Sequence, residues 1–313
     1  MIQVSAPGKI HLIGEHSSVY GKPAILAAIN LRFYATISKS EKKEILGITQ
    51  YDNAIKNFQE NLEKLISEKF KIKKIPNYKI EFRNEIPLGS GLGSSAAFCA
   101  IFSLALLEFL KIKWDLNLVN ELTFEGEKIF NGNPSGGDNH TVVYGGLIWF
   151  RKETDTLKTF TPLPFKNLNN FLLIDSGKPS ESTADMVILT SLRAKRSNLT
   201  FKKIIDDQEF LAKEMINVLE ISDEKKLMQI IKSAESNLEK IGVVGKVAKG
   251  IIRKIEALKG AAKITGGGGI KKGSGIILAF HKEPNKLIKF AESNNLRYYS
   301  TQVSNEGVKL ENE

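Results

Sequence analysis

A glycine-rich segment opens the most apolar stretch of the sequence. Residues 87–97 read Pro-Leu-Gly-Ser-Gly-Leu-Gly-Ser-Ser-Ala-Ala, and apolar residues continue to Leu110. Glycines at alternate positions let a backbone turn tightly and approach an anion without a Cβ in the way. The two serines stand where a helix begins, and the unpaired N–H groups and dipole of a helix N-terminus favour phosphate. The segment therefore predicts a phosphate-binding loop, and the alternative is a plain glycine-rich turn with a serine cap.

Two more segments carry groups that could take part in chemistry. Near the N-terminus, Lys9 follows a Pro-Gly pair at positions 7–8, and Glu15-His16 comes a few residues later. The Pro-Gly pair predicts a turn, which would bring these charged groups to the ends of strands. A lysine this close to the N-terminus is usually solvated when it is considered alone. Residues 263–269, Lys-Ile-Thr followed by four glycines, provide backbone that another group can approach closely.

Composition limits the classes of protein to consider. The chain has 313 residues, a length that suggests about two domains. Its formal net charge of +10 would attract anions. Lysines are interleaved with acidic residues, as at 223–226, which is typical of solvated helix faces. No nucleic-acid-binding module is recognisable, so we expect no nucleic-acid partner. The single cysteine, Cys99, excludes a disulfide framework and a thiolate metal cluster.

Two observations concern the location of the protein. The N-terminus lacks a charged region followed by an apolar one, so no signal peptide is predicted. The longest apolar run, residues 96–107, is too short to span a bilayer. We therefore expect a cytoplasmic protein with no membrane partner.

The elements that must position these residues are interspersed helices and strands, which predict an α/β or α+β protein. We expect an exposed loop at the basic segment 193–198 and a domain junction near 151–169. Apolar spacing and composition predict the other elements. The expected helices are 53–70, 94–110, 119–130 and most of 209–258, and the expected strands are 2–6, 9–13, 24–38, 78–82, 142–150, 170–175 and 274–280.

Four segments in this order resemble the GHMP kinase superfamily, named for galactokinase, homoserine kinase, mevalonate kinase and phosphomevalonate kinase. Within the superfamily the resemblance is closest to the mevalonate kinases, because Gly14-Glu15-His16 is followed by Val-Tyr-Gly-Lys-Pro-Ala at 19–24. Galactokinases continue their Gly-Glu-His differently. The resemblance runs from about Pro7 to Phe280. The four segments are 7–24, 87–97, 125–139 and 263–269.

The resemblance implies an α+β fold of two domains. An N-terminal domain of the ribosomal protein S5 domain 2-like type would span residues 1–165 and contain the phosphate loop. A ferredoxin-like C-terminal domain would span residues 166–313. ATP and its acceptor would meet between the two domains.

The resemblance also implies which residues bind ATP and Mg²⁺. Ser95 and Glu127 would hold Mg²⁺, a hard ion that is satisfied by one or two protein oxygens together with phosphates and water. Without the resemblance, Glu127 could be an ordinary carboxylate on a helix face. The residues that would bind the ATP phosphates are Gly89, Ser90, Gly91, Leu92, Gly93, Ser94, Ser95 and Ala96.

For catalysis, the resemblance implies that Asp138 is the base and that Lys9 is its partner. A carboxylate can accept the hydroxyl proton and a neighbouring cation favours the alkoxide, and the sequence leaves open which effect dominates. A cap on the turn before Asp138 is the alternative role of this residue. Glu15, His16 and Thr183 would line the site of the acceptor.

Three segments depart from the family pattern. The glycines at 266–269 are followed by Ile-Lys-Lys-Gly-Ser at 270–274, which makes this loop longer and more basic. Some mevalonate kinases have an arginine shortly before the position of Thr183, where this chain has Ser-Glu-Ser at 180–182. Ser17-Ser18 replaces a small apolar pair. Recognition of a substrate carboxylate could therefore depend on other groups.

The function that this resemblance implies is ATP- and Mg²⁺-dependent phosphorylation of the primary hydroxyl of mevalonate, giving 5-phosphomevalonate for isoprenoid precursor synthesis. The partners would be ATP and mevalonate, and a homodimer is plausible. One alternative is another GHMP kinase that acts on a sugar or a related alcohol. A second is a non-catalytic ATP-binding sensor, whose signature would be the loss of Lys9, Ser95, Glu127 or Asp138, and all four are intact.

Overall fold

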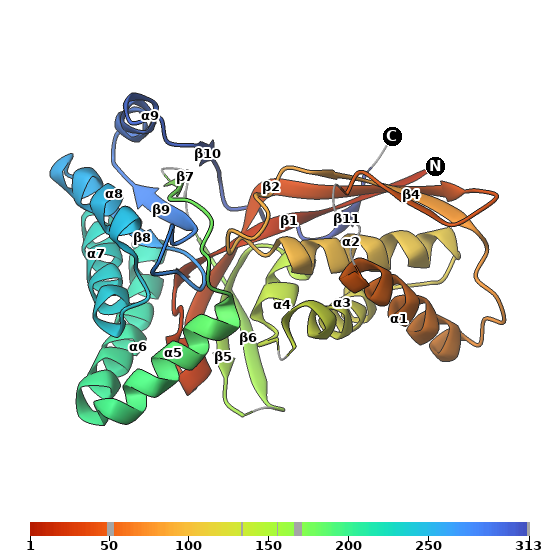
Figure 1. The fold of residues 1–313 in the computed structure, drawn as a ribbon, viewed down its shortest axis with the longest axis horizontal. Coiled ribbons are helices and arrows are strands. Elements are labelled where there is room, and N and C mark those ends of the chain that lie inside the picture. Colours follow the sequence, from red (N-terminus) through yellow and green to blue (C-terminus); the bar gives the residue numbers. More distant parts are fainter. Residues whose placement is uncertain (49–52, 133, 155, 166–170, 312–313) are drawn as a thin grey trace.

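The computed structural model describes residues 1–48, 53–132, 134–154, 156–165 and 171–311. Its helices and strands are arranged around two sheets, one of seven strands and one of four (Figure 1). This architecture confirms the predicted α+β fold class.

The larger sheet has the strand order β11-β1-β2-β4-β3, and β5 pairs with both β2 and β6. Helices α1 to α4 lie along one side of it in Figure 1. The strands are β1 (Ile2–Ile13), β2 (Ala24–Lys39), β3 (Glu44–Leu46), β4 (Tyr78–Asn84), β5 (Leu147–Lys152), β6 (Lys158–Leu163) and β11 (Lys309–Leu310). The helices are α1 (Asn53–Phe70), α2 (Ser94–Phe109), α3 (Leu116–Asn131) and α4 (Gly137–Tyr144), with a short 3-10 helix η1 (Ser17–Tyr20).

The smaller sheet is antiparallel, with the order β10-β7-β9-β8. In Figure 1 it lies at the opposite end of the molecule from α1, beside α7 and α8. Its strands are β7 (Phe171–Asp175), β8 (Ala261–Ile264), β9 (Ile276–Phe280) and β10 (Tyr298–Ser300). The remaining helices are α5 (Thr183–Arg196), α6 (Asn198–Ile221), α7 (Glu224–Ile241), α8 (Lys246–Ala257) and α9 (Pro284–Ser293).

Helix α2 is the centre of the larger core. Every residue from Ala96 to Leu107 is buried, as an all-round apolar helix requires. Phe98 and Phe102 of α2 contact Phe58 of α1, with ring centroids 5.4 and 5.5 Å from that of Phe58. Each buried aromatic side chain of this kind contributes roughly 1.5–3 kcal/mol. This core holds the N-terminal end of α2 in a fixed position.

Gly126 of α3 allows α1, α2 and α3 to pack closely. A Cβ at this position would lie 2.4 Å from a ring carbon of Phe58 and 2.9 Å from the sulfur of Cys99. Both distances are far below ordinary contact, so no side chain fits here without movement of its neighbours. Gly126 belongs to the same helix as Glu127, and the close packing therefore also positions that carboxylate.

The predicted turn at Pro7-Gly8 is wrong. Strand β1 runs without interruption from Ile2 to Ile13, and its register with β2 shifts between Pro7 and Gly8. A β-bulge accommodates the proline, which has no N–H to donate to the ladder. Lys9 therefore lies inside a long strand and not just after a turn.

Two further predictions are partly wrong. The strand expected at 142–150 is the end of α4 followed by β5, because Gly145 and Gly146 both have positive φ and separate the two elements. The loop expected at 193–198 is the last turn of α5 and the start of α6. Basic side chains favour the negative end of a helix dipole, which explains their place at the end of α5.

The predicted boundary between residues 165 and 166 stays a prediction, because residues 166–170 lie outside the described residues, as does position 170 of the strand expected at 170–175. The junction expected near 151–169 contains β6. The C-terminal segment returns to the larger sheet, where Val4 of β1 pairs with Leu310 of β11. None of the described helices is long and apolar enough to cross a membrane.

Candidate active site

The glycine-rich segment connects β4 to the N-terminus of α2, as the sequence predicted. Gly89, Gly91 and Gly93 have φ values of +66°, +86° and +72°, a region that glycine adopts without strain. Gly93 is the N-cap of α2, and no side chain caps this helix end. The alternative of a serine cap is therefore wrong. The first N–H groups of α2 are left available to an anion.

Segments far apart in the sequence meet at this loop. The amide of Lys9 on β1 donates a hydrogen bond to the Leu92 carbonyl at 2.9 Å. A Cβ on Gly91 would lie 3.0 Å from the Thr265 carbonyl oxygen, and one on Gly266 would lie 3.1 Å from the Gly91 Cα. The first and the last of the motifs identified in the sequence thus both contact the second.

Lys9 and Asp138 form an ion pair beside the helix end. The Lys9 Nζ lies 3.1 Å from the Asp138 Oδ2, and the two side chains are 3% and 35% exposed. Asp138 lies in the first turn of α4. A Cβ on Gly93 would lie 2.7 Å from the Lys9 Cγ, so the lysine stem passes directly along the N-cap of α2. The ammonium and the carboxylate are thereby brought next to the predicted phosphate site.

His11 gives Lys9 a second partner, which the sequence interpretation missed. The His11 Nδ1 lies 3.3 Å from the Lys9 Nζ. Burial, together with the charges of Lys9 and Lys263, holds the pKa of His11 well below its usual value. A neutral imidazole can accept a hydrogen bond from the ammonium, so His11 positions Lys9. Its signal in the sequence is a histidine two residues along the same strand, on the same face.

Glu127, Ser95 and Asn131 form a second polar group near Asp138. The Asn131 amide donates to the Glu127 Oε2 at 3.1 Å and to the Ser95 hydroxyl at 3.4 Å. Burial, followed by the charge of Asp138, raises the pKa of Glu127 to about 7. The Glu127 Oε1 is buried and has no hydrogen-bond partner among the described residues.

This arrangement fits a divalent cation. A cation near Glu127 would offset the burial of the carboxylate and its repulsion by Asp138. Within the described part of the chain, no three His, Cys, Asp or Glu side chains cluster closely enough to hold a metal by themselves. Mg²⁺ commonly binds through one or two protein oxygens and completes its shell with phosphates and water. The sparse donor set is therefore compatible with a metal that arrives with a nucleotide.

His16 and Thr183 both lie next to Gly267. The His16 Nε2 donates to the Gly267 carbonyl at 3.0 Å. A Cβ on Gly267 would lie 3.1 Å from the Thr183 Oγ1. Burial lowers the pKa of His16 to about 4, and its Nδ1 is buried without a hydrogen-bond partner among the described residues. The imidazole is therefore neutral and keeps one acceptor for another group.

Glu15 is buried and does not line an open surface. It forms a buried ion pair with Lys263, and both side chains are at most 1% exposed. The Lys263 ammonium also donates to the Ile264 carbonyl at 2.8 Å. The ion pair thus links the residues just before η1 to β8. Lys263 belongs to the predicted motif 263–269, but the sequence interpretation assigned it no role. A lysine among apolar residues is itself a signal of a buried partner.

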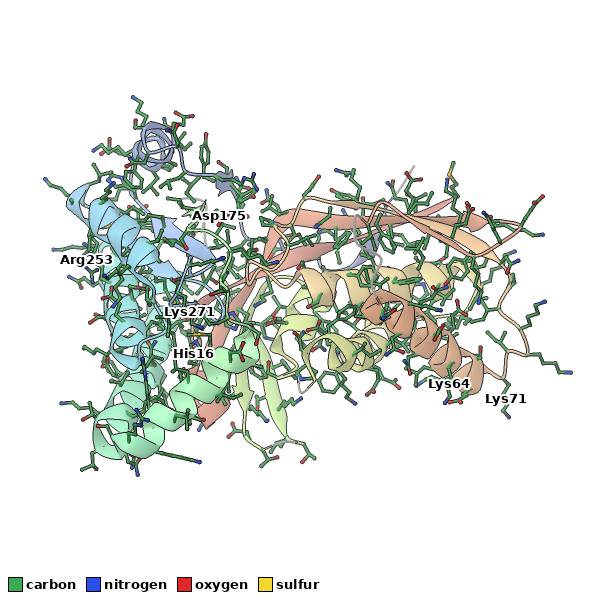
Figure 2. The ribbon with its side chains drawn as sticks, in the orientation of Figure 1. His16, Lys64, Lys71, Asp175, Arg253 and Lys271 are labelled. Atoms are coloured by element: carbon green, nitrogen blue, oxygen red, sulfur yellow. The ribbon has the colours of Figure 1, made fainter. Side chains whose placement is uncertain are left out.

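The additional residues of the third motif form an ordered turn. Their start is bound by Glu181, whose carboxylate accepts hydrogen bonds from the Ile270 and Lys271 amides at 3.4 and 3.2 Å. Their end is bound by Ser274, whose hydroxyl donates to the Gly269 carbonyl at 2.8 Å. Figure 2 shows Lys271 and His16 toward the end of the molecule that carries the smaller sheet, far from Lys64 and Lys71 at the α1 end. Glu181 lies in the segment where some mevalonate kinases have an arginine, and in this protein it anchors the loop.

Comparisons with known proteins agree with this geometry. Residues 53–146 match the model of the GHMP kinases N terminal domain, and residues 2–39 match the galactokinase galactose-binding signature. A mevalonate kinase of Archaeoglobus fulgidus is 33% identical over 268 residues, which cover 85% of this chain and 88% of that protein. A mevalonate kinase of Arabidopsis thaliana is 25% identical, with 99% of each chain covered.

The fold comparison points the same way. A crystal structure of L. major mevalonate kinase in complex with R-mevalonate matches with a TM-score of 0.82 at 23% identity, covering 96% of each chain. This likeness shows a shared fold of the GHMP kinase class. The Archaeoglobus relative, at 33% identity over 85% of this chain, shows that the chain belongs to the mevalonate kinase family of the GHMP kinases.

Proposed function

We propose that this protein is an ATP-dependent kinase that phosphorylates the primary hydroxyl of mevalonate and gives 5-phosphomevalonate for isoprenoid precursor synthesis. The observation that supports it most strongly is the Lys9–Asp138 pair, 3.1 Å apart beside the uncapped N-terminus of α2. The named relatives, which are mevalonate kinases, support mevalonate as the acceptor. A cytoplasmic location and a homodimer stay part of this proposal.

Phosphoryl transfer requires positioning and charge stabilisation more than covalent chemistry. In the proposal, residues 89–96 bind the nucleotide phosphates through backbone N–H groups and the dipole of α2. Asp138 accepts the proton of the attacking hydroxyl, while the Lys9 ammonium stabilises the negative charge that develops on that oxygen. Lys9 is almost fully buried, so its charge acts in a region of low dielectric.

Ser95 and Glu127 are the residues that would hold Mg²⁺. The bound ion would supply charge neutralisation at the nucleotide phosphates. The buried, unpaired Oε1 of Glu127 supports this role. Asn131 orients the same carboxylate from the next turn of α3.

The acceptor would bind between His16 and Thr183. A neutral imidazole and a hydroxyl, both in contact with Gly267, suit the hydroxyl groups of mevalonate. Glu15 would act indirectly, since it is buried against Lys263. We assign it the role of positioning η1 and the adjacent His16.

A second candidate function is phosphorylation of a sugar, because residues 2–39 match a galactose-binding signature. A non-catalytic ATP sensor is the third, although Lys9, Ser95, Glu127 and Asp138 are all present. The mevalonate proposal has the support of relatives that cover most of the chain.

An acceptor panel separates these functions. ADP release is measured with Mg-ATP and mevalonate, phosphomevalonate, galactose or homoserine as the acceptor. We expect turnover with mevalonate at least a hundredfold above each other acceptor, because a site built for particular hydroxyl groups discriminates strongly. Turnover with galactose alone would favour the second candidate. ATP binding without turnover of any acceptor would favour the third.

A further inference from the structure

A second lysine lies at the opposite end of the glycine-rich loop from Lys9. We propose that Lys178, which follows β7, binds the polyphosphate of the nucleotide across Gly89. The inference rests on the proposed function, because it takes residues 89–96 as the phosphate site. It adds a residue that the sequence motifs did not single out.

The contact between Lys178 and the loop is direct. A Cβ on Gly89 would lie 3.3 Å from the Lys178 Cε and 3.7 Å from its Nζ. Gly89 has no Cβ, so the end of the lysine side chain reaches the loop backbone. Lys9 makes the equivalent approach at Gly93, where its Cγ would lie 2.7 Å from a Cβ. The two lysines therefore flank the first and last glycines of the loop.

Hydrogen bonds hold the backbone of Lys178 in this place. The Ser176 amide donates to the Gly275 carbonyl at 3.0 Å, and the Gly275 amide donates to the Gly177 carbonyl at 3.1 Å. The Ser274 amide also donates to the Ser176 hydroxyl at 2.9 Å. A Cβ on Gly275 would lie 3.1 Å from the Ser90 carbonyl oxygen. The loop extension at 270–274 thus ties the Lys178 segment to the glycine-rich loop.

The nearby acids are occupied by other donors. The Asp175 carboxylate accepts a hydrogen bond from the Gly177 amide at 2.7 Å, and Figure 2 labels Asp175 at the end of β7. The Glu181 carboxylate accepts from the Ile270 and Lys271 amides. Within the described residues, the Lys178 ammonium has no ion pair or hydrogen bond.

An ammonium without an acidic partner, next to free backbone N–H groups, is suited to bind an anion. Lys9 forms an ion pair with Asp138, whereas no acid among the residues that the structure describes forms an ion pair with Lys178. A phosphate on the loop would receive backbone N–H groups from α2 and an ammonium from Lys178. Because Lys178 is exposed, it can reach the phosphates after the nucleotide arrives. We therefore assign it to binding and charge stabilisation, and not to proton transfer.

The test is calorimetric binding of ATP, ADP and adenosine to Lys178→Met, Lys178→Arg and a control. Lys282→Met is the matched control, since Lys282 is also exposed and lies at the other end of β9. We expect Lys178→Met to weaken ATP binding about tenfold, as loss of a charge-assisted hydrogen bond predicts. Adenosine binding should not change, and Lys178→Arg should retain most of the ATP affinity.

The outcomes distinguish this inference from the proposed function. ATP affinity of Lys178→Met within twofold of the unaltered protein would overturn the role of Lys178 alone. An equal loss of ATP and adenosine affinity would also overturn it, because that loss indicates damage to the fold. If the unaltered protein binds no ATP, the phosphate site and the proposed function are both wrong.

Discussion

Glu235 on α7 is an acid placed in an apolar environment. Its Oε2 accepts a hydrogen bond from the Ile264 amide at 3.0 Å, and its Oε1 is buried without a partner among the described residues. Burial raises the pKa of Glu235 from 4.5 to about 8, against smaller opposing effects of the hydrogen bond from the Ile264 amide and of the charge of Lys263. Between these two pH values the folded protein keeps a proton that the unfolded chain has released.

The contribution of Glu235 to the free energy of unfolding should therefore fall as the pH rises from about 4.5 to about 8, and should stay level above that range. The buried neutral imidazoles of His11 and His16 act in the opposite direction below pH 6.5. Glu235→Gln removes only the first contribution, so it should raise the unfolding free energy at pH 8.5 relative to that at pH 5 by on the order of 2–4 kcal/mol. Urea unfolding of both proteins at pH 5 and pH 8.5 measures this difference in free energy. Glu220→Gln, on an exposed position of α6, should leave the pH dependence unchanged. If the unfolding free energy of Glu235→Gln had the same pH dependence as that of the unaltered protein, the raised pKa of Glu235 would be refuted.

The Glu15–Lys263 pair is a second prediction at the scale of single residues. Lys263→Met leaves the Glu15 carboxylate buried without its partner and should cost about 3–5 kcal/mol of unfolding free energy. The double variant Glu15→Gln with Lys263→Met should recover much of that loss. Unfolding midpoints in urea measure Lys263→Met, Glu15→Gln and the double variant. Simple addition of the two single effects would show that the side chains do not interact.

Packing around α2 operates at the scale of elements. Gly126→Ala places a methyl group 2.4 Å from Phe58, so it should reduce the unfolding free energy by about 1–3 kcal/mol. Gly250→Ala on α8 is the matched control, because nothing lies within 4 Å of its Cβ position. That change should stabilise the protein by up to about 1 kcal/mol. Thermal unfolding of both variants tests the contrast, and equal effects would contradict it.

The elements that sequence predicted well are those with a strong internal pattern. The spacing of apolar residues correctly predicted α1, and the continuous apolar run correctly predicted α2. The turn predicted at Pro7-Gly8 was wrong, because the residue types that form a turn also occur at a bulge in a long strand. The loop predicted at 193–198 was wrong because polar side chains suit both a loop and the end of a helix. Local composition does not distinguish these cases.

At the scale of the whole molecule, the site exists because four distant segments meet. The family resemblance located Lys9, Ser95, Glu127 and Asp138. The structure brings Lys9 to Asp138, and it brings Ser95 and Glu127 to the same Asn131 amide. Only part of the support of these residues carries a signal in one sequence, as His11 does, and the rest does not. Lys178, for example, reaches Gly89 only through pairing of β7 with β9 and through the loop at 270–275. Such contacts depend on tertiary structure and leave no local pattern.

The most direct test of the account is turnover of Mg-ATP and mevalonate by Asp138→Asn, with ATP affinity measured on the same sample. Asp223→Asn is the control, because Asp223 caps α7 and asparagine caps a helix equally well. We predict that Asp138→Asn lowers turnover by about 10²–10⁴-fold while ATP affinity stays within about twofold, and that the control is unchanged. Undiminished turnover by Asp138→Asn would contradict the central claim that Lys9 and Asp138 act on the acceptor hydroxyl.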